Sequence, residues 1–400
     1  MRELAARKDV RLLLAGQTLS MFGDWMMIMV LGIWAKVLTG SSSQAGLVFF
    51  VFAIASLAAP IGGLVVDRLP KRPLMVATHL ALAAVMCLLL LVHDRGDLWL
   101  LYTVTVLYGL GGDLFAASRS AMLKAMLPDE LLADANGAYQ SIREGLRIVA
   151  PLAGAGLFAA SGGHAVAIVD AASFVLSAAT LVALPFTEPP PAVKEHHLLR
   201  EISAGITHIA GNRVLRQLTI GLAAALLVVG FSETLLFAIT SALHHAPSFI
   251  GVLGSAQGVG AIAGGLTSAS LMRRIGDLRL AGLGLGVFAA GDGLWLFPRV
   301  WVVLPATAIA GLGIVWAVVA LGTAYQRRSP THVQGRVAAA ANMLLSVPQT
   351  ISIALGAALI TLIDYRIEIV TMAVVLCLSS VYLLTRRDES EVKAETALAA

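Results

Sequence analysis

The sequence predicts an all-α integral membrane protein with twelve transmembrane helices, arranged as two pseudo-symmetric six-helix bundles. Three observations support this fold class. Apolar residues make up 58% of the 400 residues and charged residues only 13%, with a mean hydropathy of +0.85, far from the composition of water-soluble domains. The apolar residues fall into twelve stretches of membrane length. One long polar connection, residues 186–213, divides these stretches six plus six.

Each membrane-spanning helix needs roughly 18 or more mostly apolar residues. With this minimum length, the predicted spans are 10–39, 44–67, 73–93, 98–123, 131–160, 164–185, 214–243, 247–272, 278–298, 300–325, 333–363 and 365–386.

The second and third spans are joined by the short basic segment GGLVVDRLPKR, residues 62–72. Two membrane-length helices joined by so few residues must run antiparallel. Arg68, Lys71 and Arg72 place their shared end on the cytoplasmic side, because basic residues are retained there. Asp67 then lies at the membrane boundary, where it can pair with these bases or cap a helix end.

Lys and Arg residues are distributed unevenly between the two sets of loops. The termini and the loops on their side hold 22, whereas the opposite loops hold three, at Arg95, Arg299 and Arg366. The even number of spans puts both termini on one side, and this asymmetry predicts that side to be the cytoplasm. We therefore expect a multi-pass protein of the cell (inner or plasma) membrane.

The polar connection sets the predicted domain boundaries. Residues 1–185 form an N-terminal bundle, 186–213 a cytoplasmic linker, and 214–400 a C-terminal bundle with a short charged tail. The linker opens with three consecutive prolines, which cannot continue a helix. Its later part places apolar residues at helical spacing, which predicts a short amphipathic helix on the inner membrane face, or simply a helix that joins the halves.

The two predicted bundles repeat each other weakly. Gly62-Gly63-Leu64 corresponds to Gly264-Gly265-Leu266, and Ala135-Asn136 corresponds to Ala341-Asn342. Matching segments separated by about half the chain length are typical of a protein built from two parallel structural repeats.

The segment that contains Gly63, Asp67, Arg68 and Arg72 resembles the signature loop between helices 2 and 3 of the major facilitator superfamily, roughly G-x-x-x-D-R-x-x-R-[RK]. Pro70 and Lys71 depart from the usual Gly and Arg. The resemblance implies a gating role for these four residues, as a latch that holds the cytoplasmic helix ends together. The alternative is an ordinary basic loop.

Further matches resemble the branch of macrolide-efflux proteins and enterobactin-type exporters. They are Gly23-Asp24-Trp25, Arg119, Ala135-Asn136, and Gln326 followed by Pro330 and Gly335-Arg336-Val337. Residues 150–155, with Pro151, are similar to the exporter motif G-P-x-x-G-G, in which alanine replaces two glycines here. That motif is associated with antiport, so the resemblance implies proton-coupled export, a gating role for Pro151 and no cofactor.

Five ionisable residues fall near mid-depth in the N-terminal half, where each charge costs at least about 2.5–3.5 kcal/mol. They are Asp24, Asp113, Arg143, Glu144 and Arg147. Arg143 and Arg147 share a helix face, and Glu144 can pair with Arg147. Three acids against two arginines leave one carboxylate without a counter-ion, and a proton can fill that place.

We therefore hypothesise that Asp24 or Glu144 exchanges a proton for substrate, with Arg147 shifting between acids and Asp113 taking part. The alternatives are a hydrogen bond that packs helix 1 for Asp24, and simple pairing with an arginine for Asp113.

The C-terminal half is poor in charge and carries Phe231, Trp316 and other aromatic residues in predicted helices 7 and 10. With Asp24, Asp113 and Arg143 opposite, and Glu233 near the outer end of helix 7, this predicts a site for amphiphilic and possibly cationic molecules. Alternatively, the aromatic residues face lipid and Glu233 reaches the headgroups. Asp170 and Asp292 are expected at packing positions.

Other functional classes have less support. The sequence contains neither G-x-x-x-x-G-K-[ST] nor H-E-x-x-H, so we expect neither ATP-driven transport nor an enzyme. His244-His245 lacks a third ligand nearby, so no metal site is expected.

The prediction is a monomeric exporter of drug-like or lipophilic cations by proton antiport, with protons and membrane lipids as its other partners and no nucleic acid. A lipid or lysolipid flippase, a siderophore or metabolite exporter, uptake by symport, and a membrane sensor remain alternatives.

Overall fold

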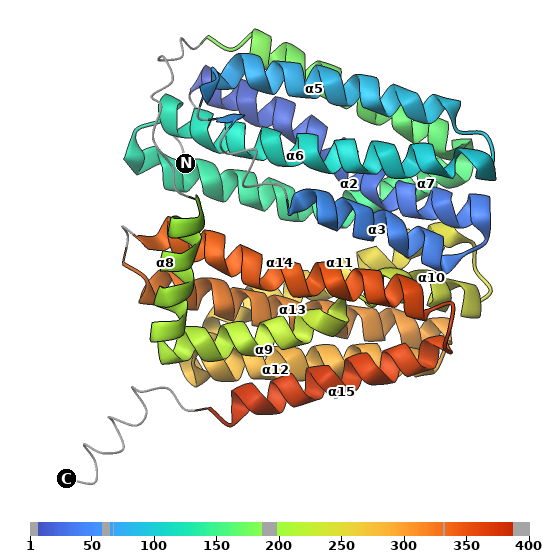
Figure 1. The fold of residues 1–400 in the computed structure, drawn as a ribbon, viewed down its shortest axis with the longest axis vertical. Coiled ribbons are helices and arrows are strands. Elements are labelled where there is room, and N and C mark those ends of the chain that lie inside the picture. Colours follow the sequence, from blue (N-terminus) through green and yellow to red (C-terminus); the bar gives the residue numbers. More distant parts are fainter. Residues whose placement is uncertain (1–6, 58–64, 67, 186–197, 331–332, 387–400) are drawn as a thin grey trace. The chain divides into compact units, whose positions relative to one another are not determined.

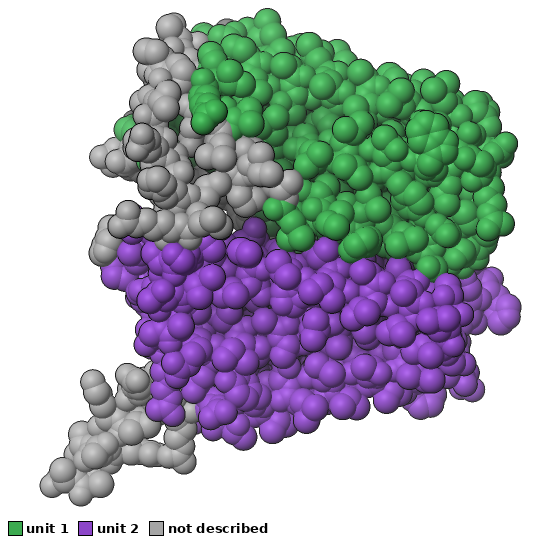
Figure 2. Space-filling model, viewed as in Figure 1, with its two compact units in different colours: residues 1–196, 247–252 green, residues 197–246, 253–400 purple. Residues whose placement is uncertain are grey.

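The computed structural model describes residues 7–57, 65–66, 68–185, 198–330 and 333–386, and this part of the chain is built of helices without β-strands (Figure 1). Eight of its helices are long and apolar enough to cross a membrane, or nine if the bent pair Ile202–Gly211 and Arg213–Val229 counts as one span. The chain divides into two compact units, shown in Figure 2. Unit 1 contains residues 1–196 and 247–252, and unit 2 contains residues 197–246 and 253–400.

The helices of unit 1 carry most of the predicted ionisable residues. They are α2 (Lys8–Thr39), α3 (Ser42–Ser56), α5 (Lys71–Leu88), α6 (Leu98–Met126) and α7 (Asp129–Val182), with the short 3-10 turns η1 (Leu89–Leu91), η2 (Arg95–Asp97) and η3 (Pro247–Phe249).

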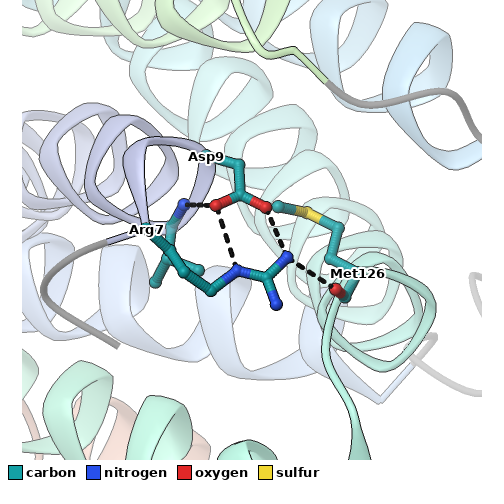
Figure 3. A network of polar contacts seen from close by, with 4 residues as sticks. Arg7, Asp9 and Met126 are labelled. Atoms are coloured by element: carbon teal, nitrogen blue, oxygen red, sulfur yellow. Dashed lines mark hydrogen bonds and ion pairs between the residues drawn. The ribbon is translucent and has the colours of Figure 1, made fainter. Parts of the chain in front are cut away.

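Helix boundaries in unit 1 follow from local chemistry. Gly40 ends α2 in the left-handed conformation (φ 72°), which glycine adopts without a side-chain clash, and its N–H donates to Lys36 O. Ser41 then caps α3 through a hydrogen bond from Gln44 N. At the start of α2, Arg7 donates to the Asp9 carboxylate at 2.7 Å and to Met126 O at 3.2 Å, which ties this helix to the end of α6 (Figure 3).

The long helix α7 contains the predicted span 131–160 and all but the last three residues of the predicted span 164–185. Its candidate membrane segment, Gly145–Val182, has 38 residues, which at 1.5 Å per residue is about 57 Å, nearly twice the roughly 30 Å of a hydrocarbon core. Gly162 interrupts the helical backbone with φ 76° and ψ 178°. The segments before and after Gly162 are therefore separate helices joined at a break.

Helix α2 packs closely against both segments of α7. A Cβ atom at Gly154 would lie 3.0 Å from the backbone of Met26, and one at Gly163 would lie 2.3 Å from the Trp34 ring. Small residues that let helix backbones approach are typical of packing between membrane helices. The core around this contact combines the centre of α2 with α5 and α6, through Met27, Leu31, Met86 and Leu101 among others.

Unit 2 contains the remaining helices. They are α8 (Leu198–Gly211), α9 (Arg213–Val229), α10 (Ser232–Ala242), most of α11 (Ile250–Ile275), α12 (Asp277–Gly293), η4 (Leu294–Leu296), α13 (Val300–Arg328), α14 (Gln334–Leu359) and α15 (Tyr365–Leu384).

Short helix–helix distances in unit 2 also depend on glycine. A Cβ atom at Gly284 would lie 2.6 Å from Gly313 O, so α12 and α13 approach at backbone distance. Ser380 Oγ of α15 donates to Gly282 O of α12 at 2.7 Å. Helix α8 meets α9 at 108°, and Figure 1 shows it lying across the direction of α9.

Three predicted spans have other boundaries in the structure. The predicted span 44–67 begins in α3, and its residues 58–64 and 67 lie outside the described residues. The predicted span 214–243 consists of α9 and α10, interrupted at Gly230 and Phe231. The predicted span 278–298 is α12 followed by η4. The count of twelve spans and the side on which the termini lie stay predictions.

Candidate functional site

Asp24 lies in the middle of α2, the first long apolar helix of the chain. Tyr108 Oη of α6 donates a hydrogen bond to Asp24 Oδ1 at 2.8 Å, and Ser20 Oγ lies 3.5 Å from Asp24 Oδ2. Ser20 and Asp24 are four residues apart and therefore share a helix face. Within the described part of the chain, Asp24 forms no salt bridge. Its carboxyl group is held by neutral donors and not by a cation.

A second acid, Asp170 of α7, lies directly beside this part of α2. A Cβ atom at Gly23 would be 2.2 Å from Asp170 Oδ1, so Asp170 occupies the space that the missing side chain of Gly23 leaves. Asp170 is fully buried and interacts electrostatically with Asp24. Ser173 Oγ lies 3.3 Å from Asp170 Oδ1, whereas Oδ2 has no hydrogen-bond partner among the described residues. Asp170 was expected only at a packing position, and the structure adds its proximity to Asp24.

Asp24 also lines a small cavity within unit 1, of about 80 Å³. The polar side chains around it come from three helices, and aromatic and aliphatic side chains complete the wall. The lining residues are Gln17, Ser20, Met21, Asp24, His79, Leu82, Gly112, Phe115, Ala116, Tyr139 and Phe174. His79 of α5 is held against this wall by stacking on Phe115, with ring centroids 3.7 Å apart.

The sequence did not single out Gln17, His79 or Tyr139. Each is one polar residue in an apolar helix, and only the packing of α2, α5 and α7 brings them to one cavity. Of the three, His79 carried a signal in the sequence, because a histidine within an apolar span needs a polar partner and therefore indicates a possible site.

The other predicted N-terminal residues lie on α6 and α7. Asp113 follows the cavity-lining Gly112, makes a hydrogen bond with Ser56, and has one buried oxygen, Oδ2, without a partner in the described part of the chain. Arg143 is partly buried and interacts electrostatically with Arg119, whose guanidinium lies 3.6 Å from the centroid of the Tyr139 ring.

The predicted pairing of Glu144 with Arg147 stays a prediction. The Arg147 side chain is exposed, and the side chain of Glu144 lies outside the described residues.

The predicted substrate residues of the C-terminal half lie in unit 2. Phe231 is buried at the joint between α9 and α10 and packs against Gly356 of α14. Trp316 Nε1 of α13 donates to Thr267 Oγ1 of α11 at 2.9 Å. Glu233 is half-buried in the first turn of α10. Phe231 and Trp316 thus contribute contacts between helices of unit 2, and their role in substrate binding stays a prediction.

Of the predicted gating residues, Gly63 and Asp67 lie outside the described residues. Arg68 is exposed. Arg72 donates from Nε to Leu181 O at 2.8 Å and also to Val182 O, so it binds the last carbonyl groups of α7. These carbonyls lack partners within the helix, and a cation there also stabilises the helix dipole. Pro151 is buried inside α7.

Comparison with known proteins gives the family. A sequence profile described as Major Facilitator Superfamily matches residues 13–243 and 222–400. The chain is 30% identical to the MFS-type transporter YfiS of Bacillus subtilis (strain 168) over 183 residues, which are 45% of this chain and 43% of that protein. It is 24% identical to macrolide efflux protein A of Streptococcus pyogenes over 207 residues, half of each chain. The matches therefore span about half the length of these curated relatives.

Solved transporter structures share the fold over nearly the whole chain. A bacterial homologue of the iron transporter ferroportin in an inward-facing state gives a TM-score of 0.72 at 16% identity, covering 95% of this chain and 99% of that one. A mutant of the peptide transporter POT in complex with alafosfalin gives 0.73 at 14% identity, covering 94% and 93%. At this identity the likeness concerns the fold. The profile match shows that the chain belongs to the major facilitator superfamily, and its long apolar helices are those of an integral membrane protein.

Proposed function

We propose that this transporter exports small amphiphilic compounds, such as drug-like or lipophilic cations, in exchange for protons. The observation that carries the proposal is the position of Asp24. This carboxyl group lies in the middle of a membrane helix and faces a cavity, and among the described residues it is held by neutral donors and has no fixed cation to balance its charge. A proton or a cationic substrate can each provide that balance, and competition between the two couples their movements.

Two further observations support export rather than another direction of transport. The sequence shares 24% identity with a macrolide efflux protein over half of its length. Pro151 lies inside α7, within the segment similar to the exporter motif. Alternating access then moves substrate through rocking of two repeats around a central site, which is the common mechanism of transporters built from repeats. We further propose that the protein works as a monomer in the cell membrane.

The experiment uses proteoliposomes that contain the purified full chain and an internal pH-sensitive dye. Lipophilic cations, macrolides and labelled lysolipids are added in turn across an imposed pH difference. We expect lipophilic cations to trigger proton movement, and Asp24→Asn to abolish it. Asp292→Asn is the matched control, because Asp292 of α12 is also buried but lies in unit 2. It should retain the response.

Retention of full proton-coupled transport by Asp24→Asn would show that another group carries the proton. Absence of proton movement with every compound, together with scrambling of the labelled lysolipid, would replace the exporter with the flippase considered from the sequence.

A further inference from the structure

The cavity beside Asp24 is large enough for more than a single water molecule. One water needs on the order of 10–15 Å³ of such space, whereas the cavity offers about 80 Å³. Its polar lining comes from Gln17, Ser20 and Asp24 of α2, His79 of α5 and Tyr139 of α7. Gln17, Ser20 and Asp24 follow one another at spacings of three and four residues, so they line the cavity from one face of α2.

Two of these side chains present polar atoms that have no hydrogen-bond partner among the described residues. The Gln17 side chain is 2% exposed, and neither its Oε1 nor its Nε2 makes a hydrogen bond with any described residue. His79 is 1% exposed, and its Nδ1 is likewise without a partner among the residues that the structure describes. Buried polar atoms left unpaired destabilise a fold, so native proteins rarely keep them without a ligand or water.

The charge and hydrogen-bonding character of the lining favours a cation that carries N–H groups. None of the eleven lining residues is Lys or Arg, and Asp24 supplies a carboxylate. Gln17 Oε1 accepts hydrogen bonds, and His79 Nδ1 accepts in the tautomer that carries its proton on Nε2. Arg119, which lies over the Tyr139 ring, is not among the lining residues.

The remaining wall suits the apolar part of such a molecule. Phe115, Phe174, Leu82 and Met21 line the cavity, and the centroid of the His79 ring lies 3.7 Å from that of Phe115 and 5.2 Å from that of Phe174. Aromatic faces attract cations and also accept aliphatic chains. The cavity thus combines unpaired acceptors, the unpaired donor Gln17 Nε2, one acid and an apolar wall.

We infer that this cavity binds the protonated primary or secondary amine of an amphiphilic substrate, through N–H hydrogen bonds to Asp24, Gln17 and His79. The inference rests on the proposed function, because it names the chemical group by which that transporter recognises its cargo. It also separates substrates, because a quaternary ammonium ion has the same charge but no N–H to donate.

The test is equilibrium binding to the detergent-solubilised full chain, measured by titration calorimetry without a proton gradient. The probes are a long-chain primary alkylammonium, the trimethylammonium ion with the same alkyl chain, and the corresponding alcohol. Hydrogen bonds to charged groups contribute enough binding free energy that the affinity for the primary ammonium should be at least about ten times that for the trimethylammonium ion. The alcohol, which lacks the charge, should bind more weakly than the primary ammonium.

Variants separate hydrogen bonding from the size of the ligand. Gln17→Leu and His79→Phe remove the unpaired atoms and keep apolar volume, so each should lose most of the preference for the primary ammonium. Gln217→Leu is the matched control, because Gln217 of α9 is also buried and its Oε1 is unpaired within the described chain, but it lies in unit 2. It should keep the full preference. Thermal unfolding of each variant verifies that it is folded.

Three results would overturn the inference. The first is equal affinity for the two ammonium ions. The second is a preference for the primary ammonium that persists in both cavity variants, because such a preference would reflect ligand size alone. The third is no binding of the primary ammonium, which would leave water as the occupant of the cavity. Failure of the proposed function is distinguishable. Selective amine binding without proton movement in proteoliposomes would keep the site and reject antiport, whereas proton exchange without amine selectivity would keep antiport and reject the site.

Discussion

At the scale of single residues, two buried carboxyl groups of this protein differ in their surroundings. Asp24 accepts hydrogen bonds and lines a cavity, whereas Glu368 of α15 is 1% exposed and neither carboxyl oxygen has a partner among the described residues. A carboxyl group without hydrogen bonds in an apolar environment costs folding free energy and brings no compensating contact. Burial alone therefore does not distinguish these two acids, whereas access to a cavity does.

We predict that Glu368→Met raises the midpoint of thermal unfolding in detergent. Methionine keeps a similar volume and removes a buried polar group whose unsatisfied state costs about 1–3 kcal/mol. Glu368→Gln leaves two polar atoms in the same place and should gain less. A lower midpoint for Glu368→Met than for the unmodified chain would show that the carboxyl group makes a stabilising contact.

The sequence was sufficient to find Asp24 but not its surroundings. An acidic residue in an apolar stretch can be recognised from the sequence alone, because placing it in the membrane costs free energy wherever the helix packs. Asp170, Gln17 and His79 matter through contacts between α2, α5 and α7, which are far apart in the sequence and adjacent in space. Periodicity within one helix does not reveal which neighbour fills the space beside Gly23.

At the scale of helices, hydrophobic length predicted where apolar segments lie better than where they break. The spans around α2, α5, α6, α13 and α15 were close to the observed helices. The break between α9 and α10 was missed, because Gly230 and Phe231 are compatible with a continuous helix. A Cβ atom at Gly230 would lie 2.4 Å from Ile353 N of α14, so a tertiary contact requires glycine there.

The break in α7 gives a prediction at this scale. Gly162 has φ 76° and ψ 178°, a backbone conformation that is essentially limited to glycine and costs other residues about 1–3 kcal/mol. Gly162→Ala should therefore lower the thermal unfolding midpoint, although a Cβ atom there would meet no other atom within 4 Å.

Gly156→Ala is the control, since Gly156 lies in the helical part of α7 and has the same open surroundings. It should be neutral or slightly stabilising, because alanine is the better helix former. Equal thermal unfolding midpoints for the two variants would mean that the chain tolerates a continuous helix through residue 162. The break at Gly162 would then not be required by the fold.

At the scale of the whole molecule, the distribution of basic residues predicts how the chain is threaded through the membrane. Arg95 and Arg299 belong to the side with few bases, and Arg274 and Arg386 to the side with many. Twelve crossings require five between residues 95 and 274 and three between 299 and 386. The 38-residue segment Gly145–Val182 contributes two of them only if it turns at Gly162.

We therefore predict the labelling pattern of single cysteines placed at these four exposed positions, after the native thiols are removed by Cys87→Ser and Cys377→Ser. In intact cells a membrane-impermeant thiol reagent should label Arg95→Cys and Arg299→Cys, whereas Arg274→Cys and Arg386→Cys should react only after permeabilisation. As a control, all four cysteine variants should be labelled after permeabilisation, which shows that each thiol can react with the reagent. If residues 95 and 274 were labelled from the same side, the number of crossings between them would be even. The chain would then lack the six-plus-six threading on which two repeats rocking around one site depend.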